Sequence, residues 1–155
     1  GCLIEDNEAN QGAGVYLNFS GYANLTSLNI RDNGADSEGG GIYLYQTELI
    51  MESCTVENNN APFGGGLYIQ NSDKSALITG GEFSSNDARA SGGGIYYETG
   101  EVQVLSVDFG LDEQSNTPDD FTDASSFAGD MSYTGLGSGA SFTCSYLLGT
   151  YICDL

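Results

Sequence analysis

The sequence predicts an all-β protein built as a parallel β-helix of about four to five coils with a non-repeating C-terminal cap. The first observation is a glycine run followed by an aliphatic residue and a tyrosine, with the tyrosines 27, 25 and 28 residues apart. The second is a set of apolar columns spaced by 26 or 27 residues, and the third is an asparagine column in the same register. Repeats of this length indicate stacked coils, because one short unit cannot bury its own apolar face.

The glycine run marks one corner of each coil. Its copies are Gly39–Tyr43, Gly64–Tyr68 and Gly92–Tyr96, with a looser copy at Gly12–Tyr16. We assign the coil corners to these glycines because glycine allows positive φ where the chain bends: Gly14, Gly41, Gly66 and Gly94. Alternation after the run places Ile42 and Leu44 inward and Tyr43 outward. The sequence therefore predicts an external tyrosine ladder of Tyr16, Tyr43, Tyr68 and Tyr96.

The apolar and asparagine columns define the strands that precede each glycine run. One apolar column consists of Ile4, Ile30, Val56, Phe83 and Phe109. Three residues later stand Asn7, Asn33, Asn59 and Asn86, with Asp112 in the next coil. The local period of two indicates short strands, each paired in parallel with its equivalent one coil away. Asparagine tolerates left-handed backbone angles and can hydrogen-bond to equivalents above and below, so we expect an asparagine ladder.

The charge of the chain excludes some partners and suggests others. The chain has 22 acidic residues and only three basic ones, which gives a formal charge of −19. Nucleic acid and anionic membranes need Lys and Arg, so neither is an expected partner, and no apolar run has the length of a membrane span. The acidity indicates either solubility or calcium binding. The candidate calcium ligands lie beside Asn116 and are Asp108, Asp112, Glu113, Asp119 and Asp120. Their spacing matches no EF-hand, and turn and capping roles are the alternative.

The four cysteines predict one disulfide and two thiols. Cys144 and Cys153 lie nine residues apart in the non-repeating tail and form the expected bridge. Cys2 and Cys54 share one column two coils apart, so about 9.6 Å separates their Cα atoms, beyond the limit of roughly 7 Å for a disulfide. We expect both to be buried thiols, with a bond from Cys2 to a neighbouring chain as the alternative.

The repeat pattern supports a family resemblance over about residues 1–110. An apolar residue, Asn, Ala and a Gly-Gly-Gly-Ile-Tyr turn resemble the repeats of right-handed parallel β-helices of the pectin-lyase-like superfamily, especially bacterial surface and polymorphic-outer-membrane-type proteins. The resemblance implies right-handed coils and an extracellular or cell-surface location. The same scaffold carries lyases, hydrolases, adhesins and spacers. The sequence has no His, and Arg31, Lys74 and Arg89 lie in or next to turns without carboxylate clusters around them, so we expect no enzyme activity.

The domain organisation leads to two functional hypotheses. We assign residues 1–123 to the coils and residues 124–155 to a C-terminal capping element. Residues 1–4 already lie within the core columns, so we expect upstream sequence or another molecule to cover the first coil. The leading hypothesis is a structural protein that self-associates head to tail through this coil into a filament or surface array. The alternative is an adhesin-type module of a larger surface protein, which binds carbohydrate through the tyrosines or uses a calcium-dependent site.

Overall fold

The computed structural model describes residues 1–110, 114–123, 131–133, 136, 138–147 and 150–154. Among these residues the structure is built from strands and turns. The strands are β1 Leu3–Glu5, β2 Glu8–Gln11, β3 Val15–Thr26, β4 Asn29–Arg31, β5 Gly34–Glu38, β6 Ile42–Glu57, β7 Asn60–Phe63, β8 Leu67–Ser84, β9 Asp87–Ser91, β10 Ile95–Val107, β11 Phe121–Asp123, β12 Met131–Tyr133, β13 Ala140–Leu147 and β14 Thr150–Asp154.

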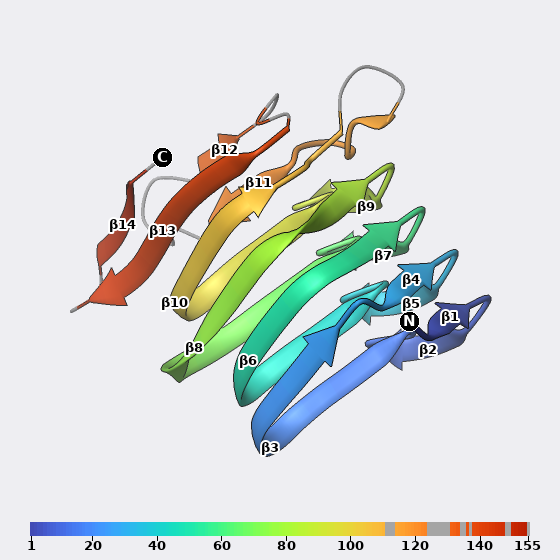
Figure 1. Ribbon diagram of the computed structural model, residues 1–155, viewed down its shortest axis with the longest axis horizontal. Helices are drawn as coiled ribbons and strands as arrows, with labels where there is room; N and C mark the ends of the chain where they lie inside the picture. Colours follow the sequence, from blue (N-terminus) through green and yellow to red (C-terminus); the bar gives the residue numbers. More distant parts are fainter. Residues whose placement is uncertain (111–113, 124–130, 134–135, 137, 148–149, 155) are drawn as a thin grey trace.

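The strands form two sheets that run along a stack of coils (Figure 1). One sheet has the order β1-β4-β6-β8-β10-β11-β12, with β3 on β6, β13 on β10 and β14 on β13. The other has the order β2-β5-β7-β9. Pairs between coils are parallel, and the register matches Ile4 to Ile30, Ile30 to Val56 and Val56 to Phe83. The predicted parallel β-helix and its 26-residue column are therefore confirmed.

The lumen of the coils holds the main hydrophobic core. Ile42 and Leu44 of β6 are fully buried in it, as are the equivalent residues Leu67 and Ile69 of β8. Tyr43 lies on the opposite face of the same strand, in a second cluster with Tyr68 and Tyr96. The predicted inward and outward alternation is confirmed, because successive side chains of a strand point to opposite faces.

The left-handed corner residues differ from the expectation. Positive φ occurs at the residue directly before each of four ladder asparagines: Asp6, Asp32, Asn58 and Ser85. In the glycine runs, positive φ belongs to the first residue of each run, such as Gly39 at 65° and Gly64 at 62°. Gly41 and its equivalents do not have positive φ. Glycine is required there because the next coil approaches too closely for a side chain: a Cβ on Gly41 would lie 2.6 Å from the Gly66 carbonyl oxygen.

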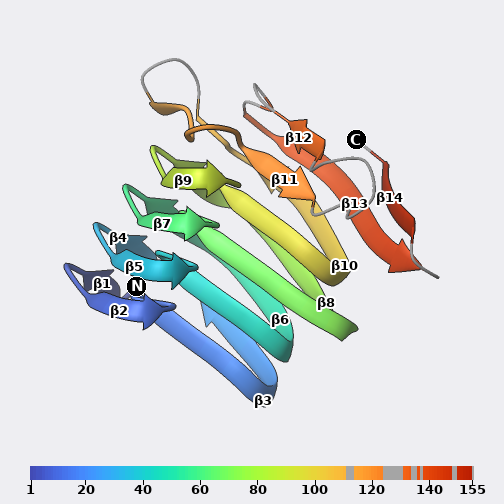
Figure 2. The same ribbon diagram turned by 180° about the vertical axis from the view of Figure 1, so that it is seen from behind.

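The C-terminal strands pair differently from the coils. β11 continues the parallel stack on β10, whereas β12 pairs antiparallel with β11 and β13 pairs antiparallel with β10. Figure 2 shows β13 and β14 at the end of the stack opposite β1, β2 and β3. β13 and β14 are joined by the predicted disulfide, with the Cα atoms of Cys144 and Cys153 4.2 Å apart.

The two thiols have different environments. Cys54 is buried, as predicted, and burial raises the pKa of its thiol. Cys2 is exposed, so the prediction that it is buried is wrong. The reason is its place in the first coil, where the described structure packs a neighbouring coil against one side only.

Candidate functional site

The outer edge of β3 is a long strand edge with unusual chemistry, and we call it the β3 edge. β3 runs from Val15 to Thr26 and pairs with β6 on one side, and no other described strand pairs with it. Its twelve residues include no Asp, Glu, Lys or Arg. The corresponding part of β6 carries Glu48 and Glu52. Soluble proteins usually protect exposed edges with charges, and the β3 edge carries none although the chain has a charge of −19.

Three exposed aromatic residues lie on the β3 edge. Tyr16 is 50% exposed, Phe19 is 72% exposed and Tyr22 is 53% exposed. Phe19 stands at the bend in the middle of β3 with φ of 49°, and its ring meets that of Tyr45 edge to face at 5.0 Å. The sequence analysis missed Phe19 and Tyr22. The sequence feature that could have identified them is that these aromatic residues do not recur in the later coils. For example, the residue of β6 that pairs with Tyr22 is Glu48.

The four repeat tyrosines form a continuous stack. The ring centroids are 5.1 Å apart for Tyr16 and Tyr43, 5.4 Å for Tyr43 and Tyr68, and 5.5 Å for Tyr68 and Tyr96. The predicted tyrosine ladder is present. The prediction that it is external is wrong for three of its members, because Tyr43, Tyr68 and Tyr96 are only 7–8% exposed. Each ring covers its neighbour, and Tyr45 and Phe63 pack against them. These ring faces are therefore not free to stack on a sugar.

Burial changes the ionisation of the stacked tyrosines. Burial, followed by the neighbouring Tyr16 hydroxyl, raises the pKa of Tyr43 to about 12. Burial and a hydrogen bond from the Tyr68 hydroxyl to Glu98 raise the pKa of Tyr68 still further above its usual range.

We expect the protein to lose stability as pH rises from about 10 to 12. In this window the unfolded chain releases tyrosine protons while the folded chain retains them at Tyr43 and Tyr68, so ionisation favours unfolding. Urea denaturation at several pH values will measure the free energy of unfolding. A Tyr43→Phe variant is the control and should show a weaker pH dependence. An unfolding free energy that does not fall above pH 10 would contradict the prediction.

The asparagines form a directional ladder through the stack. Asn33 donates from its backbone N and its Nδ2 to Asn59 Oδ1 at 3.1 and 3.0 Å. Asn7, Asn59 and Asn86 repeat this pattern toward the next coil. The fifth member is Asn116, which the sequence analysis mentioned only as a neighbour of the calcium candidates, while it aligned Asp112 with the column. Asp112 lies outside the described residues.

The two ends of the ladder differ. At the C-terminal end, Asn116 Nδ2 donates to Asp120 Oδ1 at 3.1 Å, so a carboxylate closes the ladder. At the first coil, Asn7 uses its Nδ2 for Glu5 O and Asn33 Oδ1. No described residue donates to Asn7 Oδ1. The ladder therefore presents an open acceptor in the same coil as the β3 edge.

The remaining calcium candidates have structural partners. Asp119 Oδ1 accepts from Gly92 N at 2.8 Å and from Thr122 Oγ1 at 2.7 Å. In earlier coils the equivalent glycine donates to a backbone carbonyl, as Gly64 does to Ser91 O, so Asp119 replaces that acceptor. Asp108 accepts from Gly110 N, and Glu113 lies outside the described residues. Within the described part of the chain, no three metal-ligating side chains gather, and calcium binding stays a prediction.

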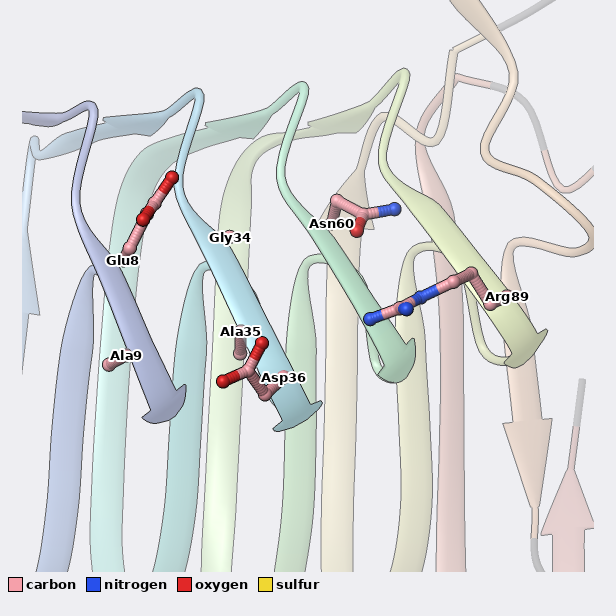
Figure 3. Close-up of a pocket in the computed structure, with 7 residues that line it drawn as sticks. All are labelled: Glu8, Ala9, Gly34, Ala35, Asp36, Asn60 and Arg89. Atoms are coloured by element: carbon pink, nitrogen blue, oxygen red, sulfur yellow. The ribbon is translucent and has the colours of Figure 1, made fainter.

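The basic residues are spread over the surface. Arg31 contacts Glu5 at 2.8 Å. Arg89 lies at a shallow hollow of about 340 Å³ on the outer face of the β2-β5-β7-β9 sheet. Figure 3 shows Arg89 extending from β9 toward β7, with Gly34 supplying no side chain between Glu8 and Asn60. The hollow lacks aromatic side chains, so nothing in it favours stacking on a sugar.

Comparison with known proteins places this geometry in a family. The protein-family model described as the right handed beta helix region matches residues 1–109 of this chain. The chain is 32% identical over 95 residues to the probable outer membrane protein PmpB of Chlamydia trachomatis serovar D. That match covers 59% of this chain but 5% of the relative, so the chain corresponds to a small part of it. No solved structure matches, and among the described residues no helix is long and apolar enough to cross a membrane. The chain belongs to the family of the right handed beta helix region.

Proposed function

We propose that this chain is a non-enzymatic β-helix module of a cell-surface protein and that it self-associates end to end through its first coil. The similarity to an outer membrane protein supports the surface location. The proposal of a structural role rests on the β3 edge, which is uncharged and carries Tyr16, Phe19 and Tyr22 in exposed positions.

Several features of the first coil support association at this end. Within the described residues, the backbone groups along the outer side of β3 pair with no strand, and such groups can pair with a strand of another molecule. Tyr16 ends the tyrosine stack, and no described ring covers its outer face. The opposite end of the stack differs, because β13 covers β10 there and Asp120 closes the asparagine ladder. Non-enzymatic function is consistent with a sequence that has no His and with Asp119 and Asp120 engaged in backbone hydrogen bonds.

Sedimentation velocity of the purified chain over a range of concentrations tests self-association. We expect the mass to rise above that of the 16.2 kDa monomer as concentration rises. Tyr22→Arg should weaken association about tenfold or more, because it places a charge in a desolvated strand pair. Gln103→Arg is the matched control, since Gln103 is an exposed residue of β10, away from the first coil. A monomer at every concentration, or equal effects of the two variants, would overturn the proposal.

A further inference from the structure

We infer that the tyrosine stack is a site of one-electron oxidation, at which a small diffusible radical takes an electron from the stack and the resulting tyrosyl radical settles on Tyr68. The step breaks the O–H bond of Tyr68: the electron goes to the oxidant and the proton goes to the carboxylate of Glu98. The products are a neutral tyrosyl radical, a neutral carboxylic acid and the reduced oxidant. Oxidants of this class include the azide and carbonate radicals. This activity is independent of the proposed association.

Glu98 is positioned to take the proton of Tyr68. The Tyr68 hydroxyl donates a hydrogen bond to Glu98 Oε2, and Gln70 Nε2 donates to Glu98 Oε1 at 3.0 Å. Gln70 therefore orients the carboxylate so that its other oxygen meets the phenol. A general base must lie within hydrogen-bond reach of the proton that it takes, and this pair meets that requirement in the resting protein.

An irregularity of β10 accounts for the position of Glu98. Tyr97 pairs with Ile69 of β8, and Thr99 pairs with the residue that follows Ile69. In this interval β10 therefore holds one residue more than β8, and that residue is Glu98. Such a β-bulge re-aims a side chain, and bulges are frequent next to functional sites. The same interval of β8 pairs with β6 in unbroken register, so the carboxylate at the stack is particular to β10.

Stacked rings connect Tyr68 with the surface. Tyr43 and Tyr68 have ring centroids 5.4 Å apart and ring planes 4° apart, and Tyr45 stacks on Tyr43 with centroids 6.5 Å apart. Tyr45 is only half-buried, whereas the two inner rings are 7% exposed. Because stacked rings in contact exchange electrons readily, Tyr45 can lose its electron first and the vacancy then passes through Tyr43 to Tyr68. A proton that an outer ring releases in transit is recovered when that ring regains its electron.

The carboxylates around Tyr68 make it the final position of the radical. Burial, the hydrogen bond to Glu98 and the charges of Glu98 and Glu38 raise the pKa of Tyr68, so its hydroxyl stays protonated until the ring is oxidised. An oxidised phenol is a strong acid, and the same carboxylates attract the positive charge that oxidation creates. Tyr97 is a buried tyrosine with a different acceptor. Its hydroxyl donates to Gly100 O at 2.5 Å, and a carbonyl oxygen is too weak a base to keep the proton.

Pulse radiolysis with the azide radical tests the inference. The chain has ten Tyr and no Trp, so the tyrosyl absorption is not mixed with that of a tryptophan radical. Radicals on exposed rings decay when two chains collide and their rings couple, whereas the radical on Tyr68 is shielded from other chains. We therefore expect a fast phase that depends on protein concentration and a persistent phase that does not.

Three variants assign the persistent phase. Tyr68→Phe should remove it, because the variant keeps the ring in the stack but lacks the O–H bond. Tyr97→Phe is the matched control, since it removes the hydroxyl of another buried ring and should leave the persistent phase unchanged. Glu98→Gln should lower the persistent yield about tenfold or more, because a positioned base contributes roughly 100-fold or more to proton transfer. The amide can still accept the hydrogen bond from Tyr68, so a merely structural role of Glu98 predicts no change.

The radical kinetics decide between the outcomes. A persistent phase that survives Tyr68→Phe, or that Tyr97→Phe removes equally, would overturn Tyr68 as the position of the radical. An unchanged persistent yield in Glu98→Gln would overturn proton transfer to Glu98, and this variant decides alone if circular dichroism shows that Tyr68→Phe does not fold. The lack of a persistent phase in the unmodified chain would overturn the inference as a whole. None of these outcomes bears on the sedimentation test of self-association.

Discussion

Replacing Asn59 by Ala is expected to lower the free energy of unfolding by about 3 kcal/mol. Asn59 is fully buried, and its Nδ2 donates to Ile30 O and Glu57 O at 2.9 and 3.0 Å. Its Oδ1 accepts from Asn33 N at 3.1 Å. Alanine would leave these three backbone groups without this partner in a site closed to water, and each such group costs about 1 kcal/mol or more. Urea denaturation followed by circular dichroism measures the effect.

The same substitution at Asn7 is the matched control. Asn7 donates to Glu5 O and Asn33 Oδ1 in the first coil, but it is exposed and water can replace the lost bonds. Asn7→Ala should therefore cost less than about 1 kcal/mol. Asn59→Asp adds a sharper test, because a carboxylate keeps the size and the acceptors of Asn but cannot donate to Ile30 or Glu57. Equal costs for Asn7→Ala and Asn59→Ala would show that the ladder does not stabilise the stack.

The repeat made the coil architecture predictable. A repeat column predicts directly which residues pair between coils, because each coil contacts its neighbours in the same register. One such column consists of Ile4, Ile30, Val56 and Phe83. The lumen-facing positions followed from the alternation of Ile42, Tyr43 and Leu44. The boundary between coils and cap at residue 123 stays a prediction, although β12, β13 and β14 pair antiparallel beyond it.

Side-chain exposure was harder to predict than position. The sequence places Tyr43 outward, yet it cannot show that rings in successive coils stack closely enough to cover each other. Asn116 was missed as a ladder member because it stands seven residues after Phe109, whereas in the other coils the asparagine stands three residues after the apolar residue. Asp112 occupies the expected spacing, so the repeat pattern favoured it.

The residues that carry the proposed interaction do not repeat. Repeat analysis selects what recurs, and recurrence reflects packing between coils. Phe19 and Tyr22 occur in one coil, and β6 has Glu48 opposite Tyr22. The structure places both on β3, which pairs with another described strand on one side only. The proposed interaction therefore depends on residues that depart from the repeat.

Gly41→Ala is expected to destabilise the protein by about 3 to 5 kcal/mol. The Cβ of the alanine would lie 2.6 Å from Gly66 O and 3.1 Å from both Asn59 Nδ2 and Val56 Cγ1. Real Cβ contacts are essentially never shorter than 3.0 Å, so the backbone of the next coil must move. That movement would weaken the hydrogen bond of 2.8 Å from Ile42 N to Gly66 O and disturb the ladder at Asn59. A fall in melting temperature of roughly 10 °C would follow.

Gly34→Ala separates this close approach from the general effect of losing a glycine. Gly34 lies on the outer face of β5 without positive φ, and a Cβ there would meet no heavy atom within 4 Å. Alanine should be neutral or should stabilise the protein by about 0.5 to 1 kcal/mol, because it reduces the freedom of the unfolded chain. Both variants change the same atoms, so the difference in their melting temperatures measures the contact between coils alone. If Gly41→Ala melted at the same temperature as Gly34→Ala, the coils could separate at their glycine corners without cost, and close coil spacing would not explain the glycine column.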